Sequence, residues 1–104
     1  MTIATFVKVG KIDELTSGEG KLIEVNRKRI ALFNVDGRYY AIDDVCPHRG
    51  APLSEGEIEG EAVVCPWHGA MFELTTGEVR RFPAAAGVAT YEVRLEGGEI
   101  AIAV

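Results

Sequence analysis

Two short loops hold the four side chains of this sequence that are best suited to bind a transition metal. The first loop reads C-P-H-R-G and contains Cys46 and His48; the second reads C-P-W-H-G and contains Cys65 and His68. The chain has no other cysteine or histidine, and sixteen residues separate His48 from Cys65. Proline fixes φ after each cysteine, and glycine lets the backbone turn back after each histidine. Each loop can therefore present one thiolate and one imidazole on its inner side.

The distribution of the two ligand types indicates which kind of centre the loops could hold. A zinc finger usually takes a Cys–Cys pair from one element and a His–His pair from another. Here each loop supplies one residue of each type, as C-x-H in the first loop and C-x-x-H in the second. This division suits a dinuclear iron centre, in which two cysteines bind one metal and two histidines bind the other.

Three other uses of the same residues stay open at this point. The four side chains could bind a single zinc ion, since zinc accepts two cysteines and two histidines. Cys46 and Cys65 could form a disulfide, which would require an oxidising compartment. A catalytic cysteine–histidine pair would need only one of the loops, and it leaves the other unexplained.

The pair of motifs resembles that of the Rieske iron–sulfur proteins, whose pattern is C-x-H, about sixteen residues, and C-x-x-H. The resemblance covers most of the chain and implies one [2Fe–2S] cluster, with Cys46 and Cys65 on one iron and His48 and His68 on the other. It also implies the Rieske fold, in which an antiparallel β base domain is built from both ends of the chain. A cluster-binding subdomain, here at about residues 44–75, is inserted into that base.

The remaining sequence predicts the short antiparallel strands that must position these loops. Asp36-Gly37 is a strong two-residue hairpin signal, and Gly97-Gly98 joins the last two predicted strands. One helical turn is expected at residues 13–15, and a loop at residues 80–87. The result is an all-β domain. The predicted strands cover residues 5–9, 21–25, 29–35, 38–43, 62–64, 72–74, 90–95 and 99–104.

Size, composition and charge limit the possible functions. The 104 residues are expected to form a single domain, 1–104, and their net charge of −5 argues against a nucleic-acid partner. No apolar run approaches the roughly 18–20 residues of a membrane helix, and the first residues lack the basic start and apolar core of an export signal. We therefore expect a cytoplasmic protein without membrane contact, and we expect it to be a monomer.

Four glutamates occupy alternate positions between the two loops, at Glu55, Glu57, Glu59 and Glu61. Alternation would place their carboxylates on one exposed edge of an extended segment. This acidic row could steer the protein towards a basic protein surface, or it could serve solubility alone.

The residues beside the predicted ligands differ from those of the high-potential respiratory members of the family. Those members carry an extra cysteine in each loop, and the two form a disulfide; this chain has Ala51 and Trp67 near those places. They also place a serine and a tyrosine after the second H-G, where this chain has Ala70 and Phe72. Fewer hydrogen bonds to the cluster sulfurs stabilise the reduced form less. The resemblance therefore implies a low-potential Rieske protein.

Five further residues have both a functional and an ordinary interpretation. Trp67 could shield the cluster or pack against the domain. Pro83 resembles the proline of the third loop that covers the cluster in this family, but it could be an ordinary turn proline. Arg49, Arg80 and Arg81 could form a cationic rim for docking or be solvated surface charges. Of these three, Arg49 is favoured because it lies within a ligand loop.

The resemblance implies an electron carrier and not an enzyme. Rieske oxygenases hold a mononuclear iron in a separate catalytic domain, for which this chain has no room. The chain is most similar to the soluble Rieske-type ferredoxins, which carry single electrons from an NAD(P)H-dependent flavin reductase to the terminal oxygenase of a ring-hydroxylating system. The small subunit of an NAD(P)H nitrite reductase is an alternative within the family. A zinc-stabilised interaction module without a redox role is an alternative of another class.

Overall fold

Short antiparallel strands make up nearly all of the regular structure, as predicted. The computed structural model describes residues 5–47, 50–67, 69–81 and 86–104. Within these ranges the only helices are two 3-10 turns, η1 (Ile12–Glu14) and η2 (Leu53–Glu55). The helical turn expected at residues 13–15 corresponds to η1. The strands are β1 (Phe6–Lys11), β2 (Gly20–Val25), β3 (Lys28–Val35), β4 (Arg38–Asp43), β5 (Glu57–Glu59), β6 (Ala62–Val64), β7 (Met71–Glu73), β8 (Val79–Arg81), β9 (Thr90–Tyr91), β10 (Val93–Glu96) and β11 (Glu99–Ala103).

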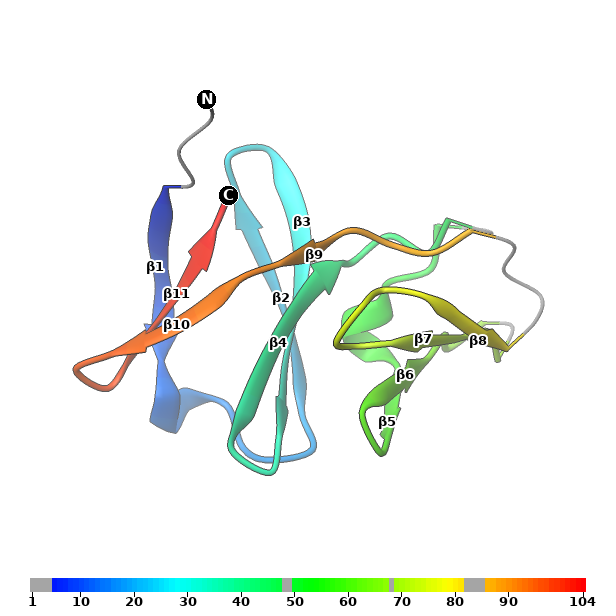
Figure 1. The fold of residues 1–104 in the computed structure, drawn as a ribbon, viewed down its shortest axis with the longest axis horizontal. Helices are drawn as coiled ribbons and strands as arrows, with labels where there is room; N and C mark the ends of the chain where they lie inside the picture. Colours follow the sequence, from blue (N-terminus) through cyan, green and yellow to red (C-terminus); the bar gives the residue numbers. More distant parts are fainter. Residues whose placement is uncertain (1–4, 48–49, 68, 82–85) are drawn as a thin grey trace.

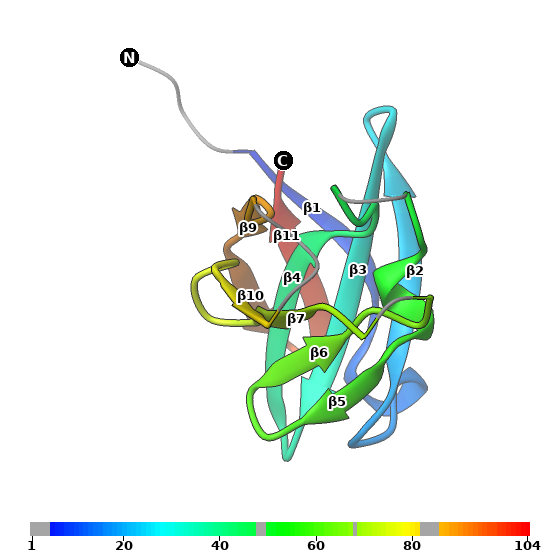
Figure 2. The same ribbon diagram turned by 90° about the vertical axis from the view of Figure 1, so that its right-hand side faces the viewer.

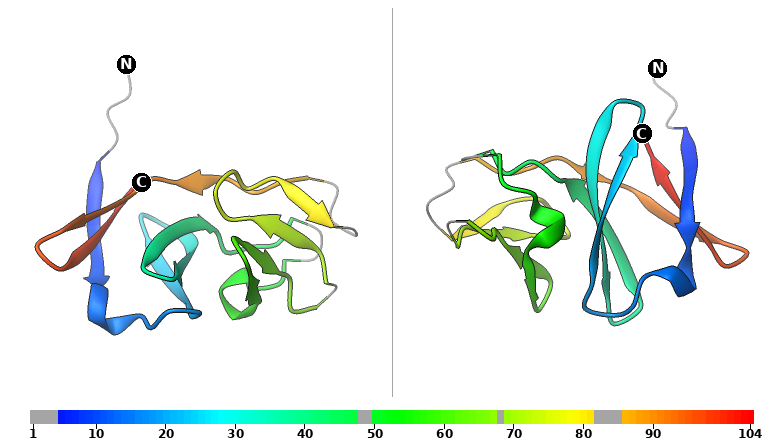
Figure 3. Two further views of the ribbon diagram at one scale, coloured as in Figure 1. Left: turned by 60° about the horizontal axis from the view of Figure 1, so that its bottom comes forward. Right: turned by 180° about the vertical axis from the view of Figure 1, so that it is seen from behind.

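Three antiparallel sheets divide the molecule into a base and an inserted part. The base consists of the sheets β1-β11-β10 and β2-β3-β4-β9, which combine strands from both ends of the chain. The third sheet, β5-β6-β7-β8, is formed by consecutive strands and lies at the opposite end of the molecule (Figures 1 and 3). The chain leaves the base after β4 and returns to it at β9. This is the architecture of a β base with an inserted subdomain.

Tight turns fix the register of the central sheet. Asp36 and Gly37 join β3 to β4 with φ values of 52° and 87°, and Asn26 and Arg27 join β2 to β3 with φ values of 51° and 63°. Two successive positive φ angles are the requirement of the type I′ hairpin turn, which matches the twist of the strands. Because β4 ends at Asp43, the second hairpin delivers the chain directly into the first cysteine loop.

Strand β3 connects two separate hydrophobic cores because successive side chains of a strand point to opposite faces. Ile30 and Leu32 belong to the core between the two base sheets, whereas Ala31 and Phe33 belong to the core between the base and the small sheet. All four side chains are buried. Burial on both faces explains the unbroken apolar run in this strand. The second core is the one that contains the two cysteines.

The structure corrects two of the predicted elements and adds one strand. Arg80 and Arg81, expected at the start of a loop, belong instead to strand β8 (Val79–Arg81), which pairs with β7. The strand expected at residues 90–95 is divided at Glu92, because β9 pairs with β4 while β10 pairs with β11. Within the acidic row, Glu57–Glu59 forms the edge strand β5. The boundaries proposed for the inserted subdomain remain a prediction, and the small sheet continues to residue 81.

No helix in the described ranges is long and apolar enough to cross a membrane.

Gly77 fixes the contact between the small sheet and the segment that leads to β9. Its φ is +77°, and its carbonyl oxygen accepts a hydrogen bond of 2.9 Å from the Val88 N–H. A β-carbon at this position would overlap the carbonyl oxygen of Val88. We expect Gly77→Ala to destabilise the protein by about 3 kcal/mol, from backbone strain and overpacking together.

The matched control for this change is Gly98→Ala. Gly98 has a similar φ of +80°, but a β-carbon there would meet nothing within 4 Å. That variant should therefore lose only about 1–2 kcal/mol, the cost of the left-handed conformation alone. Thermal unfolding of both variants measures the difference. Equal losses would show that the contact between Gly77 and Val88 is not tight in solution.

Candidate metal centre

The two cysteine loops have the same backbone structure. In the first, the Cys46 N–H donates to the Ala51 carbonyl at 2.9 Å, and the Gly50 N–H donates to the Cys46 carbonyl at 2.7 Å. In the second, Cys65 and Ala70 make the corresponding bond at 2.7 Å, and the Gly69 N–H donates to the Cys65 carbonyl at 3.1 Å. The repeated unit is therefore the hexapeptide C-P-x-x-G-A, which extends the first motif by Ala51.

Each loop needs its glycine at the fifth position. Gly50 and Gly69 have φ values of 77° and 74°, a region that residues with a β-carbon rarely adopt. The role assigned to these glycines from sequence is thus confirmed. The alanine after each glycine is completely buried, so the loop closes against the core.

The predicted histidine ligands occupy different positions within this common loop. His48 is the third residue of the first hexapeptide, whereas His68 is the fourth residue of the second. Both lie outside the described residues, as do Arg49 and Pro83. The assignment of His48 and His68 therefore remains a prediction.

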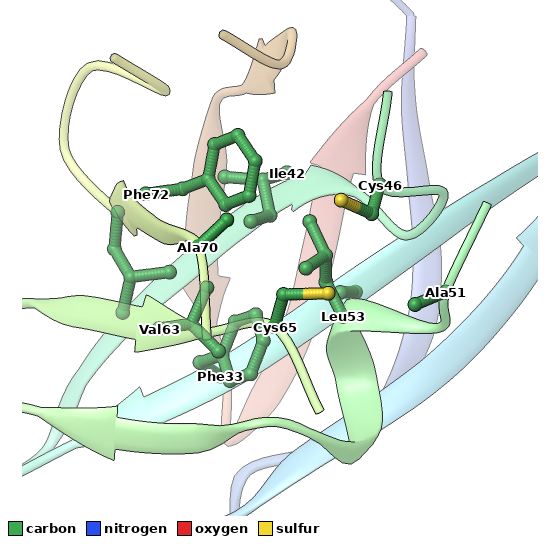
Figure 4. Close-up of a cluster of buried hydrophobic side chains, with 11 residues drawn as sticks. Phe33, Ile42, Cys46, Ala51, Leu53, Val63, Cys65, Ala70 and Phe72 are labelled. Atoms are coloured by element: carbon green, nitrogen blue, oxygen red, sulfur yellow. The ribbon is translucent and has the colours of Figure 1, made fainter. Parts of the chain in front are cut away.

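Both cysteine side chains lie in the core between the base and the small sheet. Cys46 is 1% exposed and Cys65 is 2% exposed. Figure 4 shows that they come from separate loops and point towards the same region. No disulfide joins them, and their burial disfavours a nucleophile that must reach a substrate. Other buried members of this core are Ala31, Phe33, Ile42, Ala51, Leu53, Val63, Ala70, Phe72 and Leu74.

This arrangement fits an iron–sulfur cluster. Two thiols from different loops converge in an apolar environment, and two backbone hydrogen bonds within each loop hold it closed. Thiolates are the ligands that such clusters require. Ala70 and Phe72, which follow the second loop, are fully buried and have no side-chain hydrogen-bond donor, as the sequence indicated. The low reduction potential inferred from this lack of donors remains a prediction.

Exposed apolar side chains surround the buried cysteines. Val45 is 45% exposed and Trp67 is 59% exposed, and Pro47 and Pro66 are exposed as well. Trp67 therefore places most of its side chain outside the core. Figure 2 looks onto this end of the molecule, where both loops lie beside the small sheet. The surface next to the thiols is thus partly apolar, which suits contact with another protein.

The four glutamates of the acidic row are exposed, as predicted, but the segment is extended only at Glu57–Glu59, because Glu55 belongs to η2 and Glu61 to the turn before β6. Glu55, Glu57, Glu59 and Glu61 are exposed, and Ile58 between them packs against the core. An open hollow of about 410 Å³ is lined by Glu55 and Glu57 together with the Cys65 loop. Negative charge therefore lies directly beside the second loop.

Two of the three arginines proposed for a cationic rim, Arg80 and Arg81, lie within the described residues, and they differ in their contacts. Arg80 forms an ion pair with Glu73, with 3.0 Å between Nη1 and Oε2. Arg81 is exposed at the end of β8. The charge of Arg80 is therefore partly neutralised by Glu73, so Arg80 is less suited than a free cation to attract a partner protein. The role of the rim stays a prediction.

Asp43 and Tyr91 hold the segment before β9 against the end of β4. The Tyr91 hydroxyl donates to Asp43 Oδ1 at 2.6 Å, and the Ala89 N–H donates to Asp43 Oδ2 at 3.3 Å. Burial of the phenol, its hydrogen bond to Asp43 and the negative charge of Asp43 raise the pKa of Tyr91 from 10.0 to about 12. Ionised Tyr91 would lose its donor and repel Asp43.

The pKa of Tyr91 predicts a loss of stability at high pH. Because folding raises this pKa, the stabilising contribution is complete below pH 10 and is lost as the pH rises towards about 12. We expect Tyr91→Phe to remove this part of the pH dependence from thermal unfolding curves, and ultraviolet titration to show one phenol fewer ionising near pH 12. Tyr40→Phe is the control. If Tyr91→Phe instead removed a phenol that ionises near pH 10, the Asp43 contact would be absent in solution.

Sequence reasoning missed Asp44. It is completely buried, it lies two residues before Cys46, and its carboxylate accepts a hydrogen bond of 2.8 Å from the Ser54 N–H. The available signal was a second acidic residue at the end of a predicted strand, directly before a ligand loop. Most such residues are solvated, so the sequence alone did not single it out.

Comparison with known proteins identifies the family of this site. A family model described as Rieske [2Fe-2S] domain matches residues 5–92. The 3-phenylpropionate/cinnamic acid dioxygenase ferredoxin subunit of Shigella flexneri serotype 5b (strain 8401) is 46% identical over 86 residues, which are 81% of each chain.

Solved structures give the same fold. A chain in the complex of reduced oxygenase and oxidised ferredoxin of carbazole 1,9a-dioxygenase matches with a TM-score of 0.89 and 29% identity, over 97% of this chain and 94% of that one. A Mycobacterium tuberculosis protein, described as the small subunit of an NADH-dependent nitrite reductase, matches with a TM-score of 0.91 and 26% identity, over 99% and 97%.

Proposed function

Because this chain belongs to the Rieske [2Fe–2S] domain family, we propose that it is the ferredoxin of a ring-hydroxylating dioxygenase system. It carries electrons and is not itself the catalytic subunit. The observation that carries this proposal is the pair of equivalent loops that bring two buried thiols together in one core. The close relative with 46% identity, a dioxygenase ferredoxin subunit, supports the same assignment.

The proposed ligands are Cys46 and Cys65 for one iron, and His48 and His68 for the other. The chain contains two cysteines and two histidines, which suffice for one cluster. When bound, a [2Fe–2S] cluster accepts and returns a single electron. The protein contributes the two closed loops that orient the thiolates and a core that keeps water from them. It also contributes exposed apolar side chains next to the thiols, among them Val45 and Trp67.

The proposed partners are a flavin-dependent reductase, which supplies the electron, and a terminal oxygenase, which receives it. The second partner is supported by the ferredoxin–oxygenase complex to which the chain is similar. We further propose that the protein acts as a monomer in the cytoplasm and docks only transiently. Electron carriers need short-lived contacts, for which small interfaces suffice.

Charge indicates how such docking is guided. Residues 44–81 hold seven of the 16 acidic residues and three of the 11 basic residues, a net charge of −4, which leaves −1 for the rest of the chain. The negative charge is therefore concentrated around the candidate metal centre. A basic partner surface would be attracted to this end of the molecule.

Stopped-flow kinetics test the function and the role of the acidic row together. The protein is mixed with NADH and the reductase component of the 3-phenylpropionate/cinnamic acid dioxygenase system, and then with the oxygenase component. We expect reduction and reoxidation by one electron per chain. At least one of the two steps should slow several-fold between about 0.1 and 0.5 M salt, where the screening length falls below roughly 10 Å.

The matched variants separate local charge from total charge. Glu57→Gln with Glu59→Gln should slow the salt-sensitive step, whereas Glu24→Gln with Glu92→Gln, two exposed residues of the base, should not. Rates that do not depend on salt would assign the acidic row to solubility. No electron transfer in either step, with the relative's own ferredoxin active under the same conditions, would refute the proposed function.

The small subunit of a nitrite reductase remains a second candidate because of the structural match to such a protein. Stable co-purification with a large sirohaem-containing subunit would favour it over a freely diffusing ferredoxin.

A further inference from the structure

Within the described ranges, Asp44 is the only charged residue that is buried. It follows β4 directly and precedes the first cysteine loop by one residue. Its side chain is completely inaccessible to solvent. A buried carboxylate is costly unless hydrogen bonds and an opposite charge compensate it. The contacts of Asp44 therefore show what the residue is able to do.

One set of contacts closes the first loop. The Leu53 N–H donates to the Asp44 carbonyl at 2.7 Å, and the Ser54 N–H donates to Asp44 Oδ1 at 2.8 Å. The Asp44 N–H donates in turn to the Arg29 carbonyl of β3 at 2.9 Å. Asp44 thus joins both ends of the first loop to each other and to the base. Its Oδ1 atom acts here only as a hydrogen-bond acceptor, which an amide oxygen could replace.

The second carboxylate oxygen is poorly compensated. Among the described residues, Asp44 Oδ2 has no hydrogen-bond partner, and the cation that pairs with it, Arg29 Nη2, lies 3.6 Å away on a side chain that is 53% exposed. An ion pair of this kind usually fails to offset the desolvation of the buried charge. Closure of the first loop therefore explains why a hydrogen-bond acceptor is present at Oδ1, but it does not explain why the buried side chain is a carboxylate.

The charge lies close to the first thiol. Asp44 and Cys46 are buried, and Val45 between them is exposed. Two residues of chain span at most about 7 Å between Cα atoms, even when fully extended. The chain bends at Asp44, so it is this short spacing that places the carboxylate near the buried thiol.

We propose that Asp44 is a positioning and tuning residue: Oδ1 holds the first loop closed, and the carboxylate charge keeps the reduction potential of the bound cluster low. This inference rests on the proposed function. Reduction adds one negative charge to the site. A fixed negative charge close by, in an interior where water screens it weakly, opposes that addition.

Three variants separate the two roles in the cluster-loaded protein. Asp44→Asn keeps the shape and an acceptor for the Ser54 N–H but removes the charge, whereas Asp44→Ala removes both. Asp13→Asn removes an exposed charge of the base and is the control. Protein-film voltammetry measures the potential, and loss of visible absorbance in the presence of an iron chelator measures how firmly the loop holds the cluster.

We expect Asp44→Asn to favour the reduced form at least about tenfold, which corresponds to 59 mV for one electron. Its rate of cluster loss should match that of the parent. Asp44→Ala should show a similar shift in potential together with cluster loss at least about tenfold faster, because the Ser54 N–H loses its acceptor. Asp13→Asn should change neither quantity.

An unchanged potential in Asp44→Asn would overturn the tuning role, as would an equal shift in Asp13→Asn. Equal rates of cluster loss in Asp44→Ala and Asp44→Asn would overturn the positioning role. These results are distinct from failure of the proposed function, which would appear as a parent protein that binds no iron or transfers no electron.

Discussion

Replacement of Cys65 by alanine is expected to abolish cluster binding completely. The chain has two cysteines, so no other thiol can take the vacant position. Cys65 is buried among apolar side chains, which also excludes a water molecule as an easy substitute. Iron and sulfide analysis after purification should give values close to zero for Cys65→Ala, and for Cys46→Ala as well.

The control for this prediction is Val63→Ala. Val63 is completely buried in the same core, but it is not a candidate ligand. Its truncation should destabilise the protein by about 2 kcal/mol and leave the iron content intact. If Val63→Ala lost iron as completely as Cys65→Ala, the loss would reflect general unfolding of the core and not removal of a ligand.

Removal of the metal is expected to loosen the two loops far more than the base. The base has its own core between the sheets β1-β11-β10 and β2-β3-β4-β9, and neither cysteine belongs to it. Of the backbone hydrogen bonds described above, three close the first loop and two close the second, and metal coordination would join one loop to the other. Amide exchange in the metal-free protein should therefore rise at least about tenfold across residues 44–75.

The terminal hairpin at residues 93–103 is the internal reference for that experiment. Ile100 and Ile102 are buried in the base core, so the amides of this hairpin should stay protected. A uniform loss of protection would mean that the base and the inserted part unfold as one cooperative unit.

Local sequence signals predicted the parts of the structure that depend on local geometry. Asp36-Gly37 forms the expected hairpin turn because the turn needs two positive φ angles. Both cysteine loops turn at a glycine for the same reason, and both thiols reach one core, as the paired motifs indicated.

The features that were missed depend on pairing between distant segments. Val79–Arg81 becomes a strand only because β7 lies beside it, and the division at Glu92 reflects a change of partner from β4 to β11. Neither event leaves a periodic signal in a short segment. The burial of Asp44 has a similar origin, since Ser54 and Arg29 reach it from separate elements.

The central claim is that two cysteines and two histidines of this chain hold one [2Fe–2S] cluster. Pulsed EPR of the reduced protein, labelled with nitrogen-15 at histidine, tests it most directly. Because the chain contains only two histidines, every labelled nitrogen belongs to His48 or His68. We predict strong hyperfine couplings from two histidine nitrogens in the parent and from one in either His48→Cys or His68→Cys. A purified protein that contains zinc without iron or sulfide, or a reduced cluster without histidine couplings, would contradict the account.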